Sequence, residues 1–136
     1  MAELQVCMAD VDPLGWEGTV TVEYANADSV ALRDLALVCR YGRDAKPGAI
    51  PLRIEIVTPD SLVAVETVRL QLPAPEIRQQ RAGNADFPET EQVWRKNARL
   101  LRRGVYRFRL TPVGERPVEE IRAIGISVTP AGERSK

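Results

Sequence analysis

The sequence predicts an all-β protein: an antiparallel β-sandwich, immunoglobulin-like or jelly-roll-like, with about seven to eight strands. Short segments in which apolar and polar residues alternate recur along the chain. Clusters of Gly, Pro, Asn and Asp separate them, and no long helical periodicity interrupts them. Polar residues on one face of the segments exclude a parallel sheet covered on both sides. At 136 residues, the chain has the length of a single domain, residues 1–136, with one core.

The last two segments carry the alternation most clearly. Tyr106, Phe108 and Leu110 point to one face of an expected strand at residues 104–111, because successive side chains on a strand point to opposite faces. Arg107 and Arg109 point to the other face. Residues 121–128 repeat the pattern, with an apolar set and a small or polar set: Ile124, Ile126 and Val128, then Gly125 and Ser127. We predict a pair of strands with one dry face, in which the aromatic residues belong to the core.

The other strands follow from the same alternation, taken in chain order. An N-terminal segment, residues 1–15, ends in a turn at residues 12–15. Strands of β-branched and aromatic residues are then expected at 19–24, 35–41, 52–56 and 68–72. Breakers at 26–29 and 58–61 and a loop at 42–51, rich in Gly, Pro and charge, separate these strands.

Residues 73–92 are predicted to form a long loop, because this stretch combines prolines with a polar middle. The segment that follows, residues 93–101, fits either a short helix or a strand. Trp94, Ala98 and Leu101 would share a helical face, but no helix cap precedes them. A strand or an irregular edge piece leading into Gly104 is therefore favoured.

Charge is balanced overall but uneven along the chain. Nineteen basic and nineteen acidic residues give a formal net charge of zero, which supplies no general attraction to nucleic acid or to a membrane surface. Acidic residues dominate before Arg33, the first basic residue, and arginines gather after Arg95. This asymmetry could orient the molecule on a partner. The favoured interpretation is that the two groups pair with each other within the fold.

The usual catalytic and metal-binding patterns are absent from the sequence. There is no histidine, so the commonest general base and zinc ligand are missing. No serine has the Gly-x-Ser-x-Gly context, and no glycine-rich phosphate loop occurs. Glu119 and Glu120 would point to opposite faces of a strand, and Asp10 and Asp12 lack the spacing of a calcium loop. We predict no enzymatic activity, no catalytic residue, no cofactor and no metal site.

The two cysteines, Cys7 and Cys39, allow one disulfide at most. Cys39 occupies an alternate position of the same expected strand as Leu37 and Tyr41, so we expect it to face the core with them. A buried free thiol is the favoured interpretation, and a Cys7–Cys39 bridge is the alternative in an oxidising compartment.

A candidate interaction surface combines an indole with late arginines: Trp94, Arg95, Arg102, Arg103, Arg107 and Arg109. A base-stacking surface would need aromatics and arginines on one face, whereas here they alternate, so no nucleic-acid partner is predicted. A carbohydrate-binding module is the alternative function, and it would use an exposed Trp16 or Trp94 as a stacking platform.

In its order of motifs the chain resembles GldH, a gliding-motility lipoprotein family of Bacteroidetes, from about residue 16 to 128. Trp16 precedes the first strand, a hydrophobic strand closes on Arg40, and later strands enter a turn at Pro59 and end at Leu72. The most specific part is a Gly-x-Tyr-x-Phe strand followed by Arg and Ile-x-x-Ile-Gly: Gly104, Tyr106, Phe108, Arg116, Ile121, Ile124 and Gly125. The family's Gly-x-Trp-x-Gly segment, its late Met and its lipobox cysteine have no counterpart in this chain.

The resemblance implies a non-enzymatic lipoprotein of the cell envelope, periplasm-facing or in the outer membrane. Such a protein serves as an accessory or scaffold for the gliding and protein-secretion machinery, so its expected partners are envelope proteins of that machinery. The implied membrane link is an N-terminal lipid, with the export signal and the lipidated cysteine lying outside residues 1–136. The family supplies no catalytic residue to carry over. The oligomeric state and the specific partner stay open.

Overall fold

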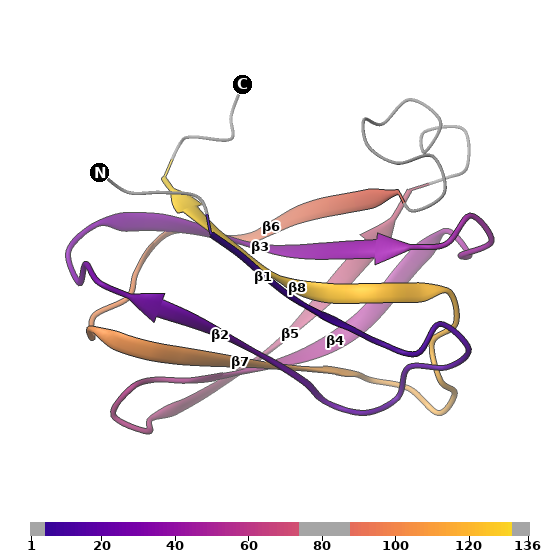
Figure 1. Cartoon of the computed structure of the whole chain (residues 1–136), viewed down its shortest axis with the longest axis horizontal. Coiled ribbons are helices and arrows are strands. Elements are labelled where there is room, and N and C mark those ends of the chain that lie inside the picture. Colours follow the sequence, from indigo (N-terminus) through magenta and orange to yellow (C-terminus); the bar gives the residue numbers. More distant parts are fainter. Residues whose placement is uncertain (1–4, 74–87, 132–136) are drawn as a thin grey trace.

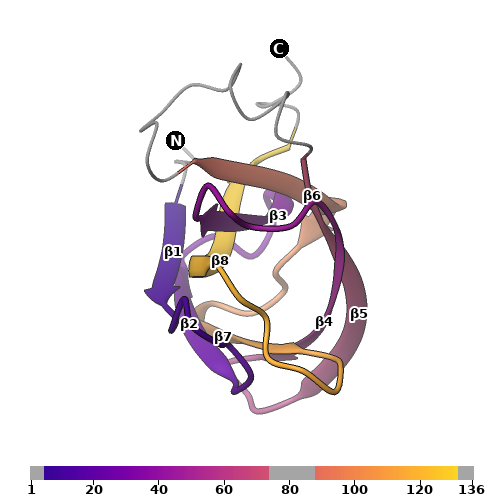
Figure 2. The same cartoon turned by 90° about the vertical axis from the view of Figure 1, so that its right-hand side faces the viewer.

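The computed structural model describes residues 5–73 and 88–131, which form eight strands in two antiparallel four-stranded sheets (Figure 1). The strands are β1 (Gln5–Asp10), β2 (Val20–Asn26), β3 (Leu32–Tyr41), β4 (Gly48–Val57), β5 (Val63–Leu72), β6 (Glu89–Arg99), β7 (Gly104–Pro112) and β8 (Ile121–Pro130). The predicted all-β sandwich is confirmed. Figure 2 shows its two layers from the side.

The sheets have the strand orders β1-β8-β3-β6 and β2-β7-β4-β5. The first half of the chain therefore pairs with the second half in nested fashion: β4 with β5, β3 with β6, β2 with β7 and β1 with β8. This is the topology of a jelly roll, a long hairpin rolled into two sheets. Of the two sandwich types left open by the sequence, the jelly roll is the correct one.

One expectation about the closing strands was wrong. β7 and β8 do not pair with each other; they lie in opposite sheets, where β7 sits between β2 and β4, and β8 sits between β1 and β3. The chain between them, residues 113–120, crosses from one sheet to the other and forms its own bridge between Trp16 and Val118. Alternation correctly indicated the dry face of each strand, but it carries no information about which strand is the neighbour.

The core lies between the sheets and contains the predicted aromatic residues. Tyr106 is 3% exposed and Phe108 is fully buried, with Val22 and Ile56 opposite Phe108 on the neighbouring strands. Trp16, 4% exposed, closes one end, and its Nε1 donates a hydrogen bond to the Gly18 carbonyl oxygen at 2.8 Å. The burial of these rings, together with the aliphatic side chains of the core, removes apolar area from water and so stabilises the fold.

Several strands extend beyond their predicted bounds, among them β5, which begins at Val63, and β1 is not among the predicted strands. The N-terminal segment contains β1, residues 89–92 of the predicted loop belong to β6, and β4 begins inside the predicted 42–51 loop. Pro51 is tolerated in β4 because the pairing of β4 with β7 begins only at the next residue, Leu52. The missing N–H of Pro51 therefore interrupts no hydrogen bond between β4 and β7. The confirmed strand at β6 settles the helix-or-strand alternative for residues 93–99. The rest of the predicted loop, 74–87, lies outside the described residues.

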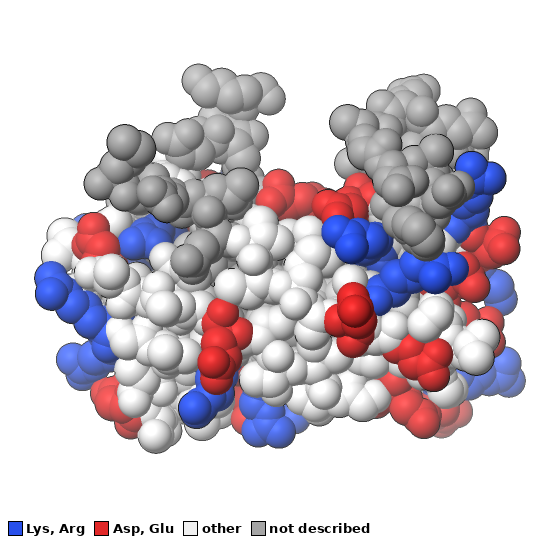
Figure 3. All heavy atoms as spheres, in the orientation of Figure 1, with Lys and Arg blue, Asp and Glu red and all other residues white. Residues whose placement is uncertain are grey.

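Ion pairs cover the outer face of the β2-β7-β4-β5 sheet. Arg107 Nε lies 3.0 Å from Glu23 Oε2, and Arg109 Nη1 lies 3.4 Å from Glu55 Oε2. Of the acidic residues that precede Arg33, Glu23 thus pairs with a late arginine, as the favoured interpretation of the charge asymmetry predicts, whereas Glu55 lies later in the chain. Figure 3 likewise shows acidic and basic side chains intermingled on the face it displays. Exposed pairs of this kind contribute little stability, about 0–1 kcal/mol each.

Both cysteines are free, and Cys39 is fully buried in the core as predicted. Burial raises the pKa of the Cys39 thiol to about 12, with a smaller contribution from the charge of Glu89. Burial also raises the pKa of Cys7, which is only partly covered. Neither thiol is therefore ionised at neutral pH in the folded protein.

Thiol labelling should follow from this burial. In a Cys7→Ser variant, we expect Cys39 to stay unmodified by Ellman's reagent at neutral pH until urea unfolds the protein. Its thiolate fraction is of the order of one in ten thousand near pH 8. The measurement is the release of the coloured thiolate with and without urea. The Cys39→Ser variant, which keeps the half-buried Cys7, is the control and should react faster. Equal rates for Cys39 with and without urea would contradict its burial.

Candidate functional site: a groove at an open corner of the sandwich

Two hollows lie at opposite ends of the described part of the sandwich. One, of about 250 Å³, opens at the corner between β5 and β6, and we call it the corner groove. Core side chains form its floor, and Leu62, Ala64, Ala98 and Leu101 form its walls. The lining also includes three arginines, Arg95, Arg99 and Arg102. The second hollow, the end cavity, is described below.

A backbone irregularity in β6 shapes the wall of the groove. The β3–β6 register shifts on both sides of Leu35, and Asn97 has a left-handed φ of 56°. Asp34 Oδ1 accepts a hydrogen bond from the Asn97 backbone N–H at 3.1 Å, which holds this bulge. β6 bends there, and the chain then enters the connection to β7.

Buried polar side chains of β2 and β7 hold the backbone of the β6–β7 connection in place. Asn26, 3% exposed, donates from Nδ2 to the carbonyl oxygens of Leu100 and Arg102 at 3.0 and 2.8 Å. The Tyr106 hydroxyl accepts a hydrogen bond from the Arg102 backbone N–H at 2.9 Å. Arg102 and the exposed Leu101 are therefore presented on a fixed backbone, as pre-organised binding sites require.

The groove's arginines are engaged in exchangeable surface pairs. Arg102 Nε lies 3.2 Å from Asp60 Oδ2, Arg95 pairs with Glu66, and Arg99 Nε donates to a backbone carbonyl oxygen. A hydrogen bond from the Thr58 hydroxyl, more than the nearby Arg102, lowers the pKa of Asp60, so this carboxylate stays charged at neutral pH. Because both arginines are exposed and only Glu66 among their partners is partly buried, an acidic partner could take over these arginines at small energetic cost.

Beside the groove, β5 is the edge strand of its sheet. Gln92 of β6 covers one part of this edge: its Oε1 accepts from the Gln71 N–H, and its Nε2 donates to the Arg69 carbonyl oxygen, both at 2.7 Å. Alternate residues of a strand direct their backbone N–H and C=O groups to the same side. The backbone groups of Val63, Val65 and Thr67 therefore point away from β4, like those of Arg69 and Gln71. No described strand pairs with them on that side.

The Gln92 bridge gives a stability prediction. A Gln92→Ala change removes two hydrogen bonds between the sheets, and we expect a loss of about 1–2 kcal/mol in the free energy of unfolding. Urea unfolding followed by circular dichroism measures it. Gln71→Ala is the matched control, since only the backbone of that residue takes part. A similar loss in both variants would show that the bridge does not stabilise the corner.

The predicted interaction surface divides into two parts. Arg95 and Arg102 line the corner groove, whereas Trp94 is half-buried against the core, with its Nε1 buried. Arg103 lies exposed on the same connection as Arg102. In contrast, Arg107 and Arg109 belong to the outer face of the other sheet, in the ion pairs already described. With Trp16 in the core and Trp94 half-buried, neither indole provides an open stacking platform.

Sequence reasoning missed the apolar residues of this corner. Leu62, Val63, Val65 and Leu101 are 62%, 57%, 51% and 67% exposed. A usable signal was present, because Val63 and Val65 alternate with Ala64 and Glu66 just after a turn, which is the pattern of a strand. Val63 and Val65 are exposed because they lie on the outer face of β5, where Val65 is opposite Glu55, and the local pattern does not indicate which face is the outer one.

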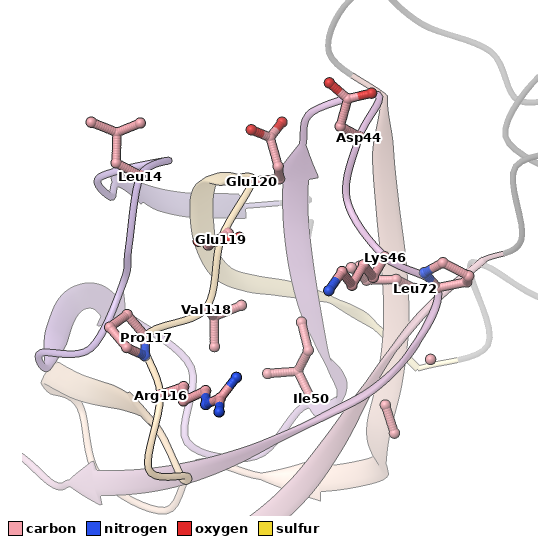
Figure 4. Close-up of a pocket in the computed structure, with 13 residues that line it drawn as sticks. Leu14, Asp44, Lys46, Ile50, Leu72, Arg116, Pro117, Val118, Glu119 and Glu120 are labelled. Atoms are coloured by element: carbon pink, nitrogen blue, oxygen red, sulfur yellow. The ribbon is translucent and has the colours of Figure 1, made fainter.

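The end cavity, of about 440 Å³, lies where β3 connects to β4 and β7 connects to β8 (Figure 4). Ile50, Leu72 and Val118 supply apolar lining, and Lys46 and Arg116 supply cationic lining. The acidic residues around it are Asp44, Glu119 and Glu120. Within the described ranges, no three Cys, Asp or Glu side chains are grouped so that they could hold a metal ion.

No known protein-family model matches this chain, and no curated protein sequence matches it. The described residues include no helix that is long and apolar enough to cross a membrane. The resemblance to the gliding-motility lipoproteins therefore stays a prediction.

Proposed function

We propose that this chain is a non-enzymatic, protein-binding domain of the cell envelope, of the gliding-motility lipoprotein type. In this proposal it is an accessory or scaffold for gliding or protein-secretion machinery, and the corner groove with the adjoining β5 edge is its docking surface. The observation that carries the proposal is the unpaired outer side of β5 at Val63–Thr67, next to an apolar groove with arginines along it.

The partner that fits is an extended segment that presents both apolar and acidic side chains on its groove-facing side, at every second residue. Its backbone would continue the β2-β7-β4-β5 sheet beyond β5, because an exposed strand edge presents N–H and C=O groups that pair with an added strand. Its inward side chains would enter the groove between Leu62 and Leu101. Its acidic side chains would meet Arg95, Arg99 and Arg102, which gives direction and specificity.

Site-specific photocrosslinking in envelope extracts of the source organism tests this surface. A photoreactive residue at Leu101 should crosslink one envelope protein, and the crosslink should be lost when Leu62→Asp is added. The control carries the photoreactive residue at Val113, a similarly exposed apolar position far from the groove, and should not give that product. Equal crosslinking from both positions, or a product that Leu62→Asp leaves unchanged, would overturn the docking surface.

Lipidation is tested separately from docking. Labelled palmitate should be incorporated into the natural gene product, and fractionation should place it with the envelope membranes. A gene product that takes up no label and stays in the cytosol would overturn the lipoprotein part of the proposal while leaving the docking surface open to its own test.

A further inference from the structure

The end cavity is independent of the docking surface, and its walls are fixed by the backbone. Trp16 and Val118 exchange two backbone hydrogen bonds, at 2.8 and 2.9 Å. Two residues later, Glu120 donates its N–H to the Pro13 carbonyl oxygen and accepts at its own carbonyl oxygen from the Gly42 N–H, both at 2.8 Å. The β7–β8 connection is thus tied to both neighbouring connections of the chain.

Glu120 is held in an unfavourable conformation by these bonds. Its φ of 68° lies in the left-handed region, which non-glycine residues seldom adopt. Such strain is kept where surrounding contacts determine it, and it is enriched at binding sites. Here the strained residue lies at the end of a run of cavity-lining residues, Arg116 to Glu120.

The cationic and the acidic side chains lie at different parts of the cavity. Figure 4 shows Lys46 and Arg116 extending toward the space between Ile50 and Val118, whereas the carboxylates of Asp44 and Glu120 lie at the opposite rim. Six other arginines of the described residues form ion pairs: Arg40, Arg53, Arg95, Arg102, Arg107 and Arg109. In that same part of the chain, Lys46 and Arg116 have no such partner, so their charges are available to a ligand.

We propose that the end cavity binds a small organic carboxylate with an apolar tail. The carboxylate would lie between Lys46 and Arg116, and the tail would cover Ile50, Leu72 and Val118. A volume of about 440 Å³ falls within the range of small-molecule pockets, which combine a mainly apolar lining with a few polar groups that fix orientation. Arginine suits a carboxylate because its planar guanidinium can donate two parallel hydrogen bonds.

Octanoate is the probe, titrated into the ¹⁵N-labelled protein and followed by the amide shifts of Lys46, Ile50 and Val118. We expect saturable binding with a Kd of about 1 mM or lower, as suits a ligand of this size. Octanamide, which lacks the charge, and acetate, which lacks the tail, should each bind at least about tenfold more weakly. Equal binding of octanoate and octanamide, or no saturable shift with octanoate, would overturn the proposal.

Variants place the ligand in the cavity. Lys46→Gln and Arg116→Gln should each weaken octanoate binding by about tenfold, whereas Glu119→Gln removes a negative charge from the wall and should tighten it by about two- to threefold. Lys96→Gln removes an exposed cation of β6, outside the cavity, and is the matched control with unchanged affinity. All four positions are exposed on the surface, so folding should be retained in each. A loss of affinity in Lys96→Gln as large as in Lys46→Gln would assign the effect to net charge and contradict the site.

Discussion

A Gly125→Ala variant is expected to lose its native β1–β8 pairing. A Cβ at this position would lie 1.9 Å from the Cys7 carbonyl oxygen and 2.6 Å from the Met8 Cα. Both are backbone atoms of the paired strand, so no side-chain rotation can relieve the overlap. Overpacking usually costs about 1–3 kcal/mol, and this contact belongs at or above the upper end because a whole strand has to move.

Thermal unfolding and hydrogen exchange measure the consequence of this overlap. A loss of about 3 kcal/mol corresponds to a fall of roughly 10 °C in the melting temperature for a chain of this length. Faster exchange should appear first in Gln5–Asp10, the strand that must move. Gly18→Ala is the control, since a Cβ there meets nothing within 4 Å. Equal melting temperatures for the two variants would show that β1 adapts without cost.

The second large effect is expected from Phe108→Ala. The ring is fully buried between Val22 and Ile56, and removing it leaves a cavity as well as losing transfer free energy, together about 3–5 kcal/mol. That is a large share of the roughly 5–15 kcal/mol by which a domain is stable. Val105→Ala, on the exposed face of the same strand, should change stability by less than about 1 kcal/mol.

Chemical unfolding of the two variants side by side tests this expectation. A shifted urea midpoint with an unchanged slope indicates a true loss of stability for Phe108→Ala. Should the variant be too unstable to purify, Phe108→Leu supplies a smaller cavity and an intermediate effect. A Phe108→Ala protein as stable as Val105→Ala would mean that the ring is not part of the core.

The fold class could be predicted because alternation is a local property. Tyr106 and Phe108 alternate with Arg107 and Arg109 whichever strands lie beside them, so their faces were assigned correctly from the sequence. β1 was missed because Val6, Cys7 and Met8 follow one another without polar residues between them. Its place in the sheet depends on β8, more than a hundred residues away.

The sites depend on relations that no local pattern contains. The corner groove exists because β5 is an edge strand and because β6 bulges at Asn97. The end cavity exists because Pro13, Gly42 and Glu120, from three separate connections, meet there. Arginine composition alone could not separate Arg102, beside a groove, from Arg107, paired with Glu23 on a flat face.

The nested strand pairing also determines how this chain has to fold. β4 and β5 are joined by a tight turn at Thr58–Ser61 and can meet early, whereas β1 pairs with β8 only after more than a hundred intervening residues have been synthesised. Pairings between distant segments form slowly, typically within milliseconds to seconds for such topologies. During that interval the apolar side of β1 has no partner.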